Sequence, residues 1–236
     1  MFHPANFFDV AGIDVGRPLG DFATVWEILG SLPELVDTLL GSQRIIKGSV
    51  ARTAVVDDGP VYIAENATIE PGVYVKGPAY IGPGVTIRHG AYVREACVFL
   101  DGSLLGHASE AKNALFLPGA KAPHFAYVGD SILGRRVNLG AGTKLSNLPI
   151  VGGRQPDGRR RSILIPAGGK QVDTGLSKLG AVLGDDVEVG CNAVLNPGVV
   201  VGPRSLIYPN ATLRKGLYSA ATLFKLRQTI DIDERK

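Results

Sequence analysis

Residues 63–110 read IAENAT-IEPGVY-VKGPAY-IGPGVT-IRHGAY-VREACV-FLDGSL-LGHASE, a run of consecutive six-residue units. Each unit opens with an aliphatic or aromatic residue and has a small or β-branched residue in its fifth place. A period of six is neither the helical period nor the alternation of a half-buried strand. It is typical of the hexapeptide repeats of a parallel β-helix, in which each unit supplies one short strand and one turn.

The pattern extends outward from this run in both directions. It begins near residue 50, loosens after residue 110, loses one residue in a five-residue unit at 128–132, and returns at 183–218. The content of 31 Gly and 15 Pro, with one Trp and one Met, suits tight corners around a thin aliphatic core. The sequence therefore predicts an all-β solenoid, a left-handed parallel β-helix of hexapeptide repeats with a short N-terminal helical cap.

The predicted boundaries follow the pattern. Residues 1–45 form an N-terminal arm and helical cap, residues 46–218 the β-helix, and residues 219–236 a C-terminal tail with a charged end. Residues 146–175 break the repeat and are basic, so we expect a loop inserted at one corner, either functional or merely solvated.

The cap is predicted from helical spacing of apolar residues in 21–41. Ser31-Leu-Pro-Glu34 fits a capping box that places Pro33 early in a helix. We therefore expect two short helices, broken near Gly30–Ser31, that pack on the first coil. A cap is needed because an open solenoid end exposes apolar core and unpaired strand edges.

Composition limits the partners and the compartment. A formal net charge of +3 does not argue for nucleic acid and is compatible with anionic small substrates. The sequence has no apolar run of membrane-spanning length and no signal-peptide layout at its start, so we expect a cytoplasmic protein without a membrane partner. Cys97 and Cys191 have no paired spacing and are expected to be free thiols in or near the core.

Three hexads make one triangular coil, so residues 18 apart stack at the strand spacing of about 4.8 Å. Arg88, Gly106 and His124 are separated by 18 and hold the second place of their units. They are expected to form one column, with a notch at Gly106 and roughly 10 Å between Arg88 and His124. One coil further the column reaches Gly140-Ala141-Gly142, whose small residues expose backbone N–H groups.

This column favours a site for a phosphorylated ligand that undergoes proton transfer, with a purely structural surface histidine as the alternative. His89 and His107 form a second column, also 18 apart. Zinc needs three protein ligands and an open position, as in carbonic anhydrases built on this fold. Because this register puts His124 in a different column, no metal site is predicted, and a zinc hydratase stays as an alternative.

A family resemblance rests on residues 107–147, HASEAKNALFLPGAKAPHFAYVGDSILGRRVNLGAGTKLSN, and extends over roughly 63–218. This run is similar to the acetyltransferase domain of bifunctional UDP-N-acetylglucosamine synthesis enzymes, which use glucosamine-1-phosphate and acetyl-CoA. Its most specific parts are Glu110-x-Lys112, His124-x-x-Tyr127-x-Gly129-Asp130 and Asn138-x-Gly140-Ala141-Gly142.

The resemblance implies a role for each matching residue. His124 would be the general base for the 2-amino group of the sugar, and Glu110 the carboxylate that orients or charge-stabilises this imidazole. The residues implied to bind the sugar and its phosphate are Arg88, Lys112, Tyr127, Asn138 and Asn147. Those implied to contact acetyl-CoA are Gly140, Ala141 and Cys191, with backbone N–H groups near Ala141 holding the oxyanion.

The resemblance also has limits. The family's Asn-Tyr-Asp-Gly stretch is here Asn147-Leu148-Pro149-Ile150, and a lysine expected just beyond it has no clear counterpart unless Arg154 or one of 159–161 replaces it. Residues 1–45 contain no uridylyl-binding loop of the nucleotidyltransferase half.

The predicted function is acetyl-CoA-dependent N-acetylation of an amino-sugar phosphate, foremost glucosamine-1-phosphate, in UDP-N-acetylglucosamine and cell-envelope precursor synthesis. The resemblance implies a homotrimer with acetyl-CoA in the groove between two solenoids. Another hexapeptide acyltransferase acting on a different or nucleotide-linked amino sugar, a zinc hydratase and a non-catalytic binding solenoid are the alternatives.

Overall fold

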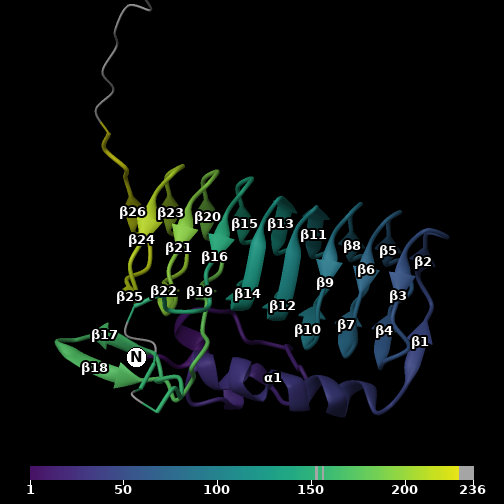
Figure 1. Cartoon of the computed structure of the whole chain (residues 1–236), viewed down its shortest axis with the longest axis horizontal. Coiled ribbons are helices and arrows are strands. Elements are labelled where there is room, and N and C mark those ends of the chain that lie inside the picture. Colours follow the sequence, from purple (N-terminus) through teal and green to yellow (C-terminus); the bar gives the residue numbers. More distant parts are fainter. Residues whose placement is uncertain (152–153, 156, 229–236) are drawn as a thin grey trace, which may run out of the picture.

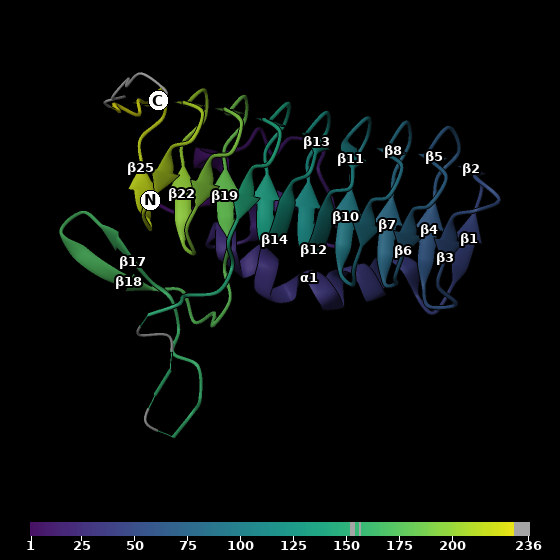
Figure 2. The same ribbon diagram turned by 45° about the horizontal axis from the view of Figure 1, so that its top comes forward.

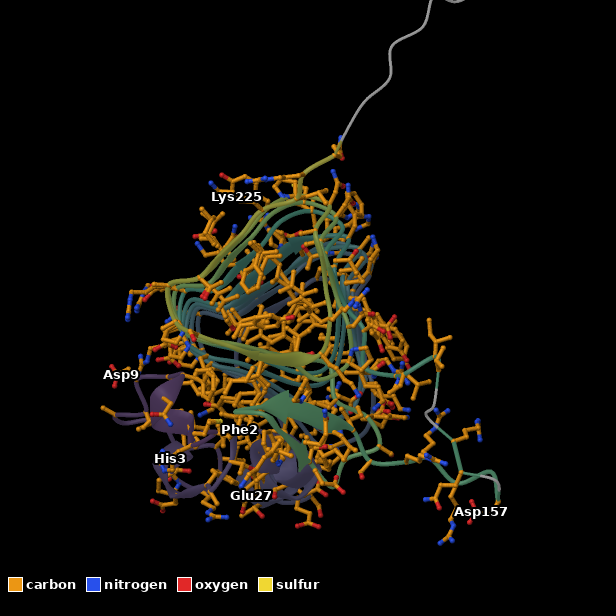
Figure 3. All side chains as sticks on the ribbon, turned by 90° about the vertical axis from the view of Figure 1, so that its left-hand side faces the viewer. Phe2, His3, Asp9, Glu27, Asp157 and Lys225 are labelled. Atoms are coloured by element: carbon orange, nitrogen blue, oxygen red, sulfur yellow. The ribbon has the colours of Figure 1, made fainter. Side chains whose placement is uncertain are left out.

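The computed structural model describes residues 1–151, 154–155 and 157–228 and has the fold that the hexads predict. It is a parallel β-solenoid, elongated in the side view of Figure 1 and triangular when viewed end-on in Figure 3. All its coil-to-coil pairings are parallel, and each coil passes three faces. We call them face 1, face 2 and face 3.

The strands divide among the faces by their pairing. Face 1 comprises β3 (Val55–Val56), β6 (Tyr74–Val75), β9 (Tyr92–Val93), the first halves of β12 (Glu110–Phe116) and β14 (Tyr127–Leu133), β16 (Lys144–Leu145), β21 (Val194–Leu195) and β24 (Thr212–Leu213). Face 2 comprises β1 (Arg44–Ile46), β4 (Val61–Ile63), β7 (Ala79–Ile81), β10 (Cys97–Phe99), the second halves of β12 and β14, β19 (Ala181–Leu183), β22 (Val199–Val201) and β25 (Gly216–Tyr218).

Face 3 is a separate sheet. It comprises β2 (Ser49–Val50), β5 (Thr68–Ile69), β8 (Thr86–Ile87), β11 (Leu104–His107), β13 (Lys121–His124), β15 (Asn138–Leu139), β20 (Glu188–Val189), β23 (Leu206–Ile207) and β26 (Leu223–Phe224). The solenoid thus continues through β26 into the segment expected to be a tail. The charged end of that tail, residues 229–236, lies outside the described residues.

The opening residues of the hexads line the interior, as their spacing predicts. Ile81, Phe99 and Phe116 stack in successive coils and are fully buried. The register between coils is not constant, however: Phe99 pairs with Ile81, 18 residues away, but with Phe116, 17 residues away. The unit that begins at Ala111 therefore has five residues, because Ala111 pairs with Val93 at a distance of 18, whereas Phe116, which opens the next unit, pairs with Phe99 at a distance of 17. The sequence pattern alone does not reveal this short unit, because AKNALF also fits a unit of six.

The predicted N-terminal helix is present, but the expected break into two short helices and the expected position on the first coil are wrong. One uninterrupted helix, α1 (Val25–Leu40), runs along the side of the solenoid rather than over its end (Figure 1). It packs on face 2, whose outward side chains are apolar; Val98, Leu115 and Ile132 are fully buried beneath it. Burial of this apolar face stabilises the lateral position, because apolar area removed from water contributes roughly 25 cal/mol per Å².

The N-terminal arm extends the same cover and includes the 3₁₀ turns η1 (Pro4–Asn6) and η2 (Leu19–Asp21). The rings of Phe2 and Trp26 lie 4.5 Å apart between centroids. Figure 3 shows Phe2 close to the underside of the triangular prism and Glu27 farther out, toward the solvent side of α1. No helix in the described part of the chain combines the length and hydropathy needed to cross a membrane.

Pro33 lies inside α1 and is accommodated by a side chain from the solenoid. Proline has no N–H, so the carbonyl of Leu29, four residues earlier, loses its helical donor. Asn113 Nδ2 donates to this carbonyl at 3.3 Å and to Asp130 Oδ1 at 2.9 Å. The helix is therefore continuous through Pro33, and also through Gly30–Ser31, where the sequence predicted a break.

This arrangement predicts a coupling between Asn113 and Pro33. We expect Asn113→Gly, which retains the positive φ of 45°, to lower the free energy of unfolding by about 1–3 kcal/mol, because it leaves buried acceptors without donors. In a Pro33→Ala background the helix amide takes the Leu29 carbonyl, and the cost of Asn113→Gly should fall. Chemical denaturation followed by circular dichroism measures all four proteins. Equal costs in the two backgrounds would contradict the coupling.

The inserted segment is more ordered than the expected loop. It leaves the solenoid after Asn147 and returns at Leu179, where Leu179 N donates to Asn147 O at 3.1 Å. It contains an antiparallel hairpin of β17 (Leu164–Ala167) and β18 (Lys170–Asp173), which projects from the side of the solenoid in Figure 2. Gly168 and Gly169 both have positive φ, as a two-residue type I′ turn requires. The buried Ile165 anchors the hairpin, whose strand β17 lies against β25.

Candidate active site

Two edges of the prism contain most of the residues considered for function. The first corner is the turn between face 3 and face 1, and His124, at the end of β13, lies there. The backbone N–H of Gly142 donates to His124 O at 3.0 Å, and the N–H of Asn192 donates to Ala141 O at 2.8 Å. His124, Ala141 and Cys191 thus follow one another along the first corner in three successive coils.

His124 lies in the same column of the solenoid as two other histidines and not in the column of Arg88. In the pairing of β11 with β13, His107 lies opposite His124, and the His89 and His107 rings stack with centroids 5.5 Å apart. The cause is the short unit at Ala111, which moves His124 by one place relative to the coil below. The prediction of an Arg88–His124 column is therefore wrong.

Gly106 leaves no notch. A Cβ on this residue would approach the carbonyl oxygen of Pro123 to 1.7 Å, so the space is already filled by the backbone of the next coil. Arg88 lies beside Gly106, and its N–H donates to Leu105 O at 2.8 Å. Glycine at 106 is required by this close backbone approach and not by a ligand.

The histidine column also bears on the zinc alternative. The sequence predicted that His124 lies in a different column from His89 and His107, which argued against zinc. This prediction is wrong, because His124 continues their column. Within the described residues, however, no three His, Cys, Asp or Glu side chains are grouped so that they could bind one metal ion.

The second corner, between face 1 and face 2, has a cluster of charged and amide side chains. We call this the polar cluster; it comprises Arg94, Glu95, Glu110, Lys112, Asn113, Asp130 and Asn147. Asp130 is at its centre, is 5% exposed and accepts hydrogen bonds from Asn113 and Asn147. The ammonium group of Lys112 lies 3.9 Å from Asp130 Oδ1. A buried carboxylate held by two amides fixes the positions of its neighbours.

Glu110 has a partner other than the one expected. Arg94 Nη1 donates to Glu110 Oε1 at 3.0 Å, and this hydrogen bond is the main cause of the raised pKa of Arg94. Glu110 lies on face 1, opposite Tyr127 in the next coil, whereas His124 lies on face 3. In this chain Glu110 therefore contacts a guanidinium and not the imidazole.

Tyr127 connects the two corners. It begins β14, three residues after His124, and its ring extends over Gly129 toward Asn147. A Cβ on Gly129 would lie 2.6 Å from the Tyr127 hydroxyl and 2.8 Å from Asn147 Nδ2. Burial raises the pKa of Tyr127, and the nearby carboxylates of Glu110 and Asp130 raise it further. The phenol is therefore neutral at pH 7 and able to donate a hydrogen bond.

The remaining predicted residues lie apart from the polar cluster. Asn138 is on face 3 and donates to Glu188 at 3.3 Å. Cys191 is exposed at the first corner and is not a core thiol, whereas Cys97 is buried, and burial raises the pKa of its thiol to about 12.

Sequence reasoning missed Arg94, although the signal was present. Arg94 precedes Lys112 by 18 residues, the same spacing that drew attention to Arg88. In the structure the N–H of Arg94 donates to Ala111 O at 2.8 Å, which places Arg94 beside Lys112 in successive coils. Arg94 is therefore the arginine that belongs to the polar cluster together with Lys112 and Asn147.

Comparison with known proteins finds relatives of the repeat region and of most of the chain. The family model described as bacterial transferase hexapeptide (six repeats) matches residues 60–95 and 180–215. The bifunctional sugar-1-phosphate nucleotidylyltransferase/acetyltransferase of Sulfurisphaera tokodaii is 34% identical over 203 residues, which are 86% of this chain and 46% of that protein. The bifunctional protein GlmU of Methanococcus maripaludis is 33% identical over 224 residues, 95% of this chain and 51% of that protein. The chain spans about half the length of the curated relatives it matches.

Among solved structures, the GDP-perosamine N-acetyl transferase from Caulobacter crescentus in complex with CoA and GDP-perosamine covers 74% of this chain and 50% of its own, with 16% identity and a TM-score of 0.31. A likeness of this size does not establish a shared activity. The hexapeptide repeats, the solenoid and the sequence matches together show that this chain contains bacterial transferase hexapeptide repeats and is similar to the bifunctional GlmU-type proteins over about half of their length.

Proposed function

We propose that the protein is an acetyl-CoA-dependent N-acetyltransferase that acts on an amino-sugar phosphate, foremost glucosamine-1-phosphate, in UDP-N-acetylglucosamine synthesis. The observation that carries the proposal is the neighbourhood of Tyr127: His124 lies three residues before it at the first corner, and the polar cluster with Lys112 and Arg94 lies at the second. A base and two cations on either side of one short strand suit an acceptor with an amine and a phosphate.

In the proposed reaction the amine nitrogen of the sugar attacks the acetyl carbonyl carbon of acetyl-CoA. The His124 imidazole takes the proton that the amine loses, the bond to the CoA sulfur breaks, and the proton passes to the leaving thiolate. The Ala141 N–H has no acceptor among the described residues, so it is available to donate to the tetrahedral oxyanion. Lys112 and Arg94 would bind the phosphate oxygens, the guanidinium in bidentate fashion.

The proposal includes a homotrimer. Face 2 is covered by α1 and the N-terminal arm, but no segment in the described part of the chain covers faces 1 and 3 in the same way. Tyr74, Tyr92 and Phe125 expose 41%, 38% and 56% of their surface on face 1 and at the first corner. A partner solenoid against this side would bury these rings and close a groove for acetyl-CoA. Sedimentation should give about three times the chain mass of 24.8 kDa, and a monomer would contradict the assembly.

Release of CoA thiol tests the activity. We expect release with glucosamine-1-phosphate and acetyl-CoA, and none with N-acetylglucosamine-1-phosphate, which has the same phosphate but no free amine. Glucosamine without phosphate should be a poor acceptor, because it makes no contact with Lys112 and Arg94. Mass spectrometry of the product locates the acetyl group. Absence of CoA release with every amino sugar in a panel of free, phosphorylated and nucleotide-linked acceptors would contradict the proposal.

A further inference from the structure

A pocket of about 490 Å³ lies between the inserted segment and the second corner. Its walls come from three stretches of chain: the start of the insert, the residues just before β17, and the second-corner turns of two coils. The residues that line it are Ser146, Leu148, Pro149, Ile150, Val151, Arg161, Ser162, Ile163, Leu164, Asn196, Pro197, Arg214 and Lys215. We call it the insert pocket. None of the residues given a role in the proposed acetyl transfer lines it.

All the charged side chains that line the insert pocket are positive. Arg161, Arg214 and Lys215 line it, and none of its lining residues is a carboxylate. None of the three cations makes a salt bridge within the described residues. Three cations around one cavity whose own lining has no carboxylate raise the local potential and attract an anionic ligand.

The remaining lining is largely apolar and includes two unusually exposed side chains. Ile150 is 98% exposed and Val151 is 89% exposed at the pocket. Apolar walls with a few placed polar groups are typical of small-molecule sites, and the volume falls within their usual range of about 300–1,000 Å³. A ligand that suits both features has phosphate groups and a flat, weakly polar body, as a nucleoside diphosphate has.

Ordered elements hold the pocket walls. Ile163 is 4% exposed. Its carbonyl oxygen accepts a hydrogen bond from Thr174 N–H at 3.1 Å, and its own N–H donates to Leu176 O at 2.8 Å. These bonds fix the backbone two residues after Arg161. On the opposite wall, Arg214 directly follows the buried Leu213 of β24. The backbone near Arg161 is therefore held by hydrogen bonds to the segment that follows the hairpin, and Arg214 is held by its place at the end of β24.

The pocket adjoins the proposed acceptor site. Ser146 lines the pocket, and the next residue, Asn147, donates to Asp130 in the polar cluster. The N–H of Ser146 donates to Leu195 O at 2.9 Å, so the second-corner turn of Asn196 follows in the next coil. A ligand bound at the polar cluster and extended along the second corner would enter the pocket.

We propose that the insert pocket binds the nucleoside diphosphate portion of a substrate, with Arg161 and Arg214 on the phosphates. This rests on the proposed function for the identity of the substrate but not for the binding itself. Two substrates contain such a group: a nucleotide-linked amino sugar as acceptor, and acetyl-CoA through its phosphorylated adenosine diphosphate. The same chemistry recognises both, and the experiment separates them.

Isothermal titration calorimetry with UDP and with CoA as separate probes tests this, on the wild type, Arg161→Gln, Arg214→Gln and the double variant. Arg52→Gln, an exposed arginine at the opposite end of the solenoid, is the matched control. Each pocket variant should weaken binding of at least one probe by about 10-fold or more, because a hydrogen bond to a charged group contributes about 1.5–3 kcal/mol. Arg52→Gln should leave both affinities unchanged.

Loss of affinity for UDP alone assigns the pocket to the acceptor, loss for CoA alone assigns it to the acetyl donor, and loss for both supports the shared chemistry. The proposal is overturned if the wild type binds neither probe, or if the double variant binds both as tightly as the wild type. Because no turnover is measured, a protein that binds UDP through Arg161 and Arg214 but transfers no acetyl group would keep the pocket and refute the acetyltransferase.

Discussion

Replacement of His124 by asparagine is expected to lower kcat for acetyl transfer by about 10²- to 10⁴-fold, the usual contribution of a general base. Asparagine keeps a polar side chain of similar reach but cannot accept the proton of the attacking amine. KM for the phosphorylated acceptor should change little, because Lys112 and Arg94 at the second corner are untouched. Steady-state release of CoA thiol gives both parameters.

His107 supplies the matched control for this variant. It lies in the same column, opposite His124 in the neighbouring strand, and its ring stacks on His89. His107→Asn should retain kcat close to the wild-type value and should unfold at a similar temperature to His124→Asn. Equal loss of activity in the two variants would mean that the histidine column is needed only for the structure. Full activity of His124→Asn would show that His124 is not the general base.

Arg94→Met is expected to lower kcat/KM for glucosamine-1-phosphate by about 10- to 100-fold, because it removes a charged donor from the phosphate. The effect should appear mainly in KM and should be absent with glucosamine as acceptor, which has no phosphate. The free energy of unfolding should change little, because Arg94 and Glu110 expose about a third of their side chains and such pairs contribute little to stability.

Arg88→Met separates the two arginines that the sequence offers. Arg88 has its backbone beside Gly106, in a column without His124, and is absent from the polar cluster. This variant should therefore keep the wild-type kcat/KM for the phosphorylated acceptor. If Arg88→Met shows the large loss and Arg94→Met does not, the phosphate does not bind at the polar cluster.

The sequence predicted the solenoid because the hexads directly encode which residues point inward. Val93, Phe99 and Leu105 are six apart and are all fully buried. Counting in sixes gave the wrong register after Ala111, because the small and apolar residues in AKNALF fit both a six-residue and a five-residue unit. This error of one residue placed His124 in the column of Arg88 instead of the column of His107, because a shift of one place in register assigns each side chain to another column.

No local pattern in the sequence predicts where α1 lies on the solenoid. Its apolar spacing indicates a helix, but the surface that buries Leu29 and Leu32 is made of residues such as Leu115 and Ile132, more than 80 positions away. Pro33 and Gly30 were strong local reasons to expect a break. The compensating donor, Asn113, comes from a distant coil and is visible only in the folded chain.

The candidate site was predicted in part. Lys112, Tyr127 and Asn147 meet at one corner, because the resemblance aligns them and the coils bring them together. Arg94 was missed and Glu110 was given the wrong partner, because both errors concern contacts between side chains of adjacent coils, which depend on the register. The insert pocket was not foreseen, since the hairpin that forms its wall was interpreted as a loop.

The way the insert joins the solenoid has a consequence for how such proteins diversify. Its two ends, at Asn147 and Leu179, already touch through a backbone hydrogen bond of 3.1 Å, and the coils on either side stack as though no residues intervened. The segment is thus an exchangeable module on an unchanged scaffold. Substitution, shortening or replacement of these residues can reshape the insert pocket while the coils of the solenoid keep their spacing.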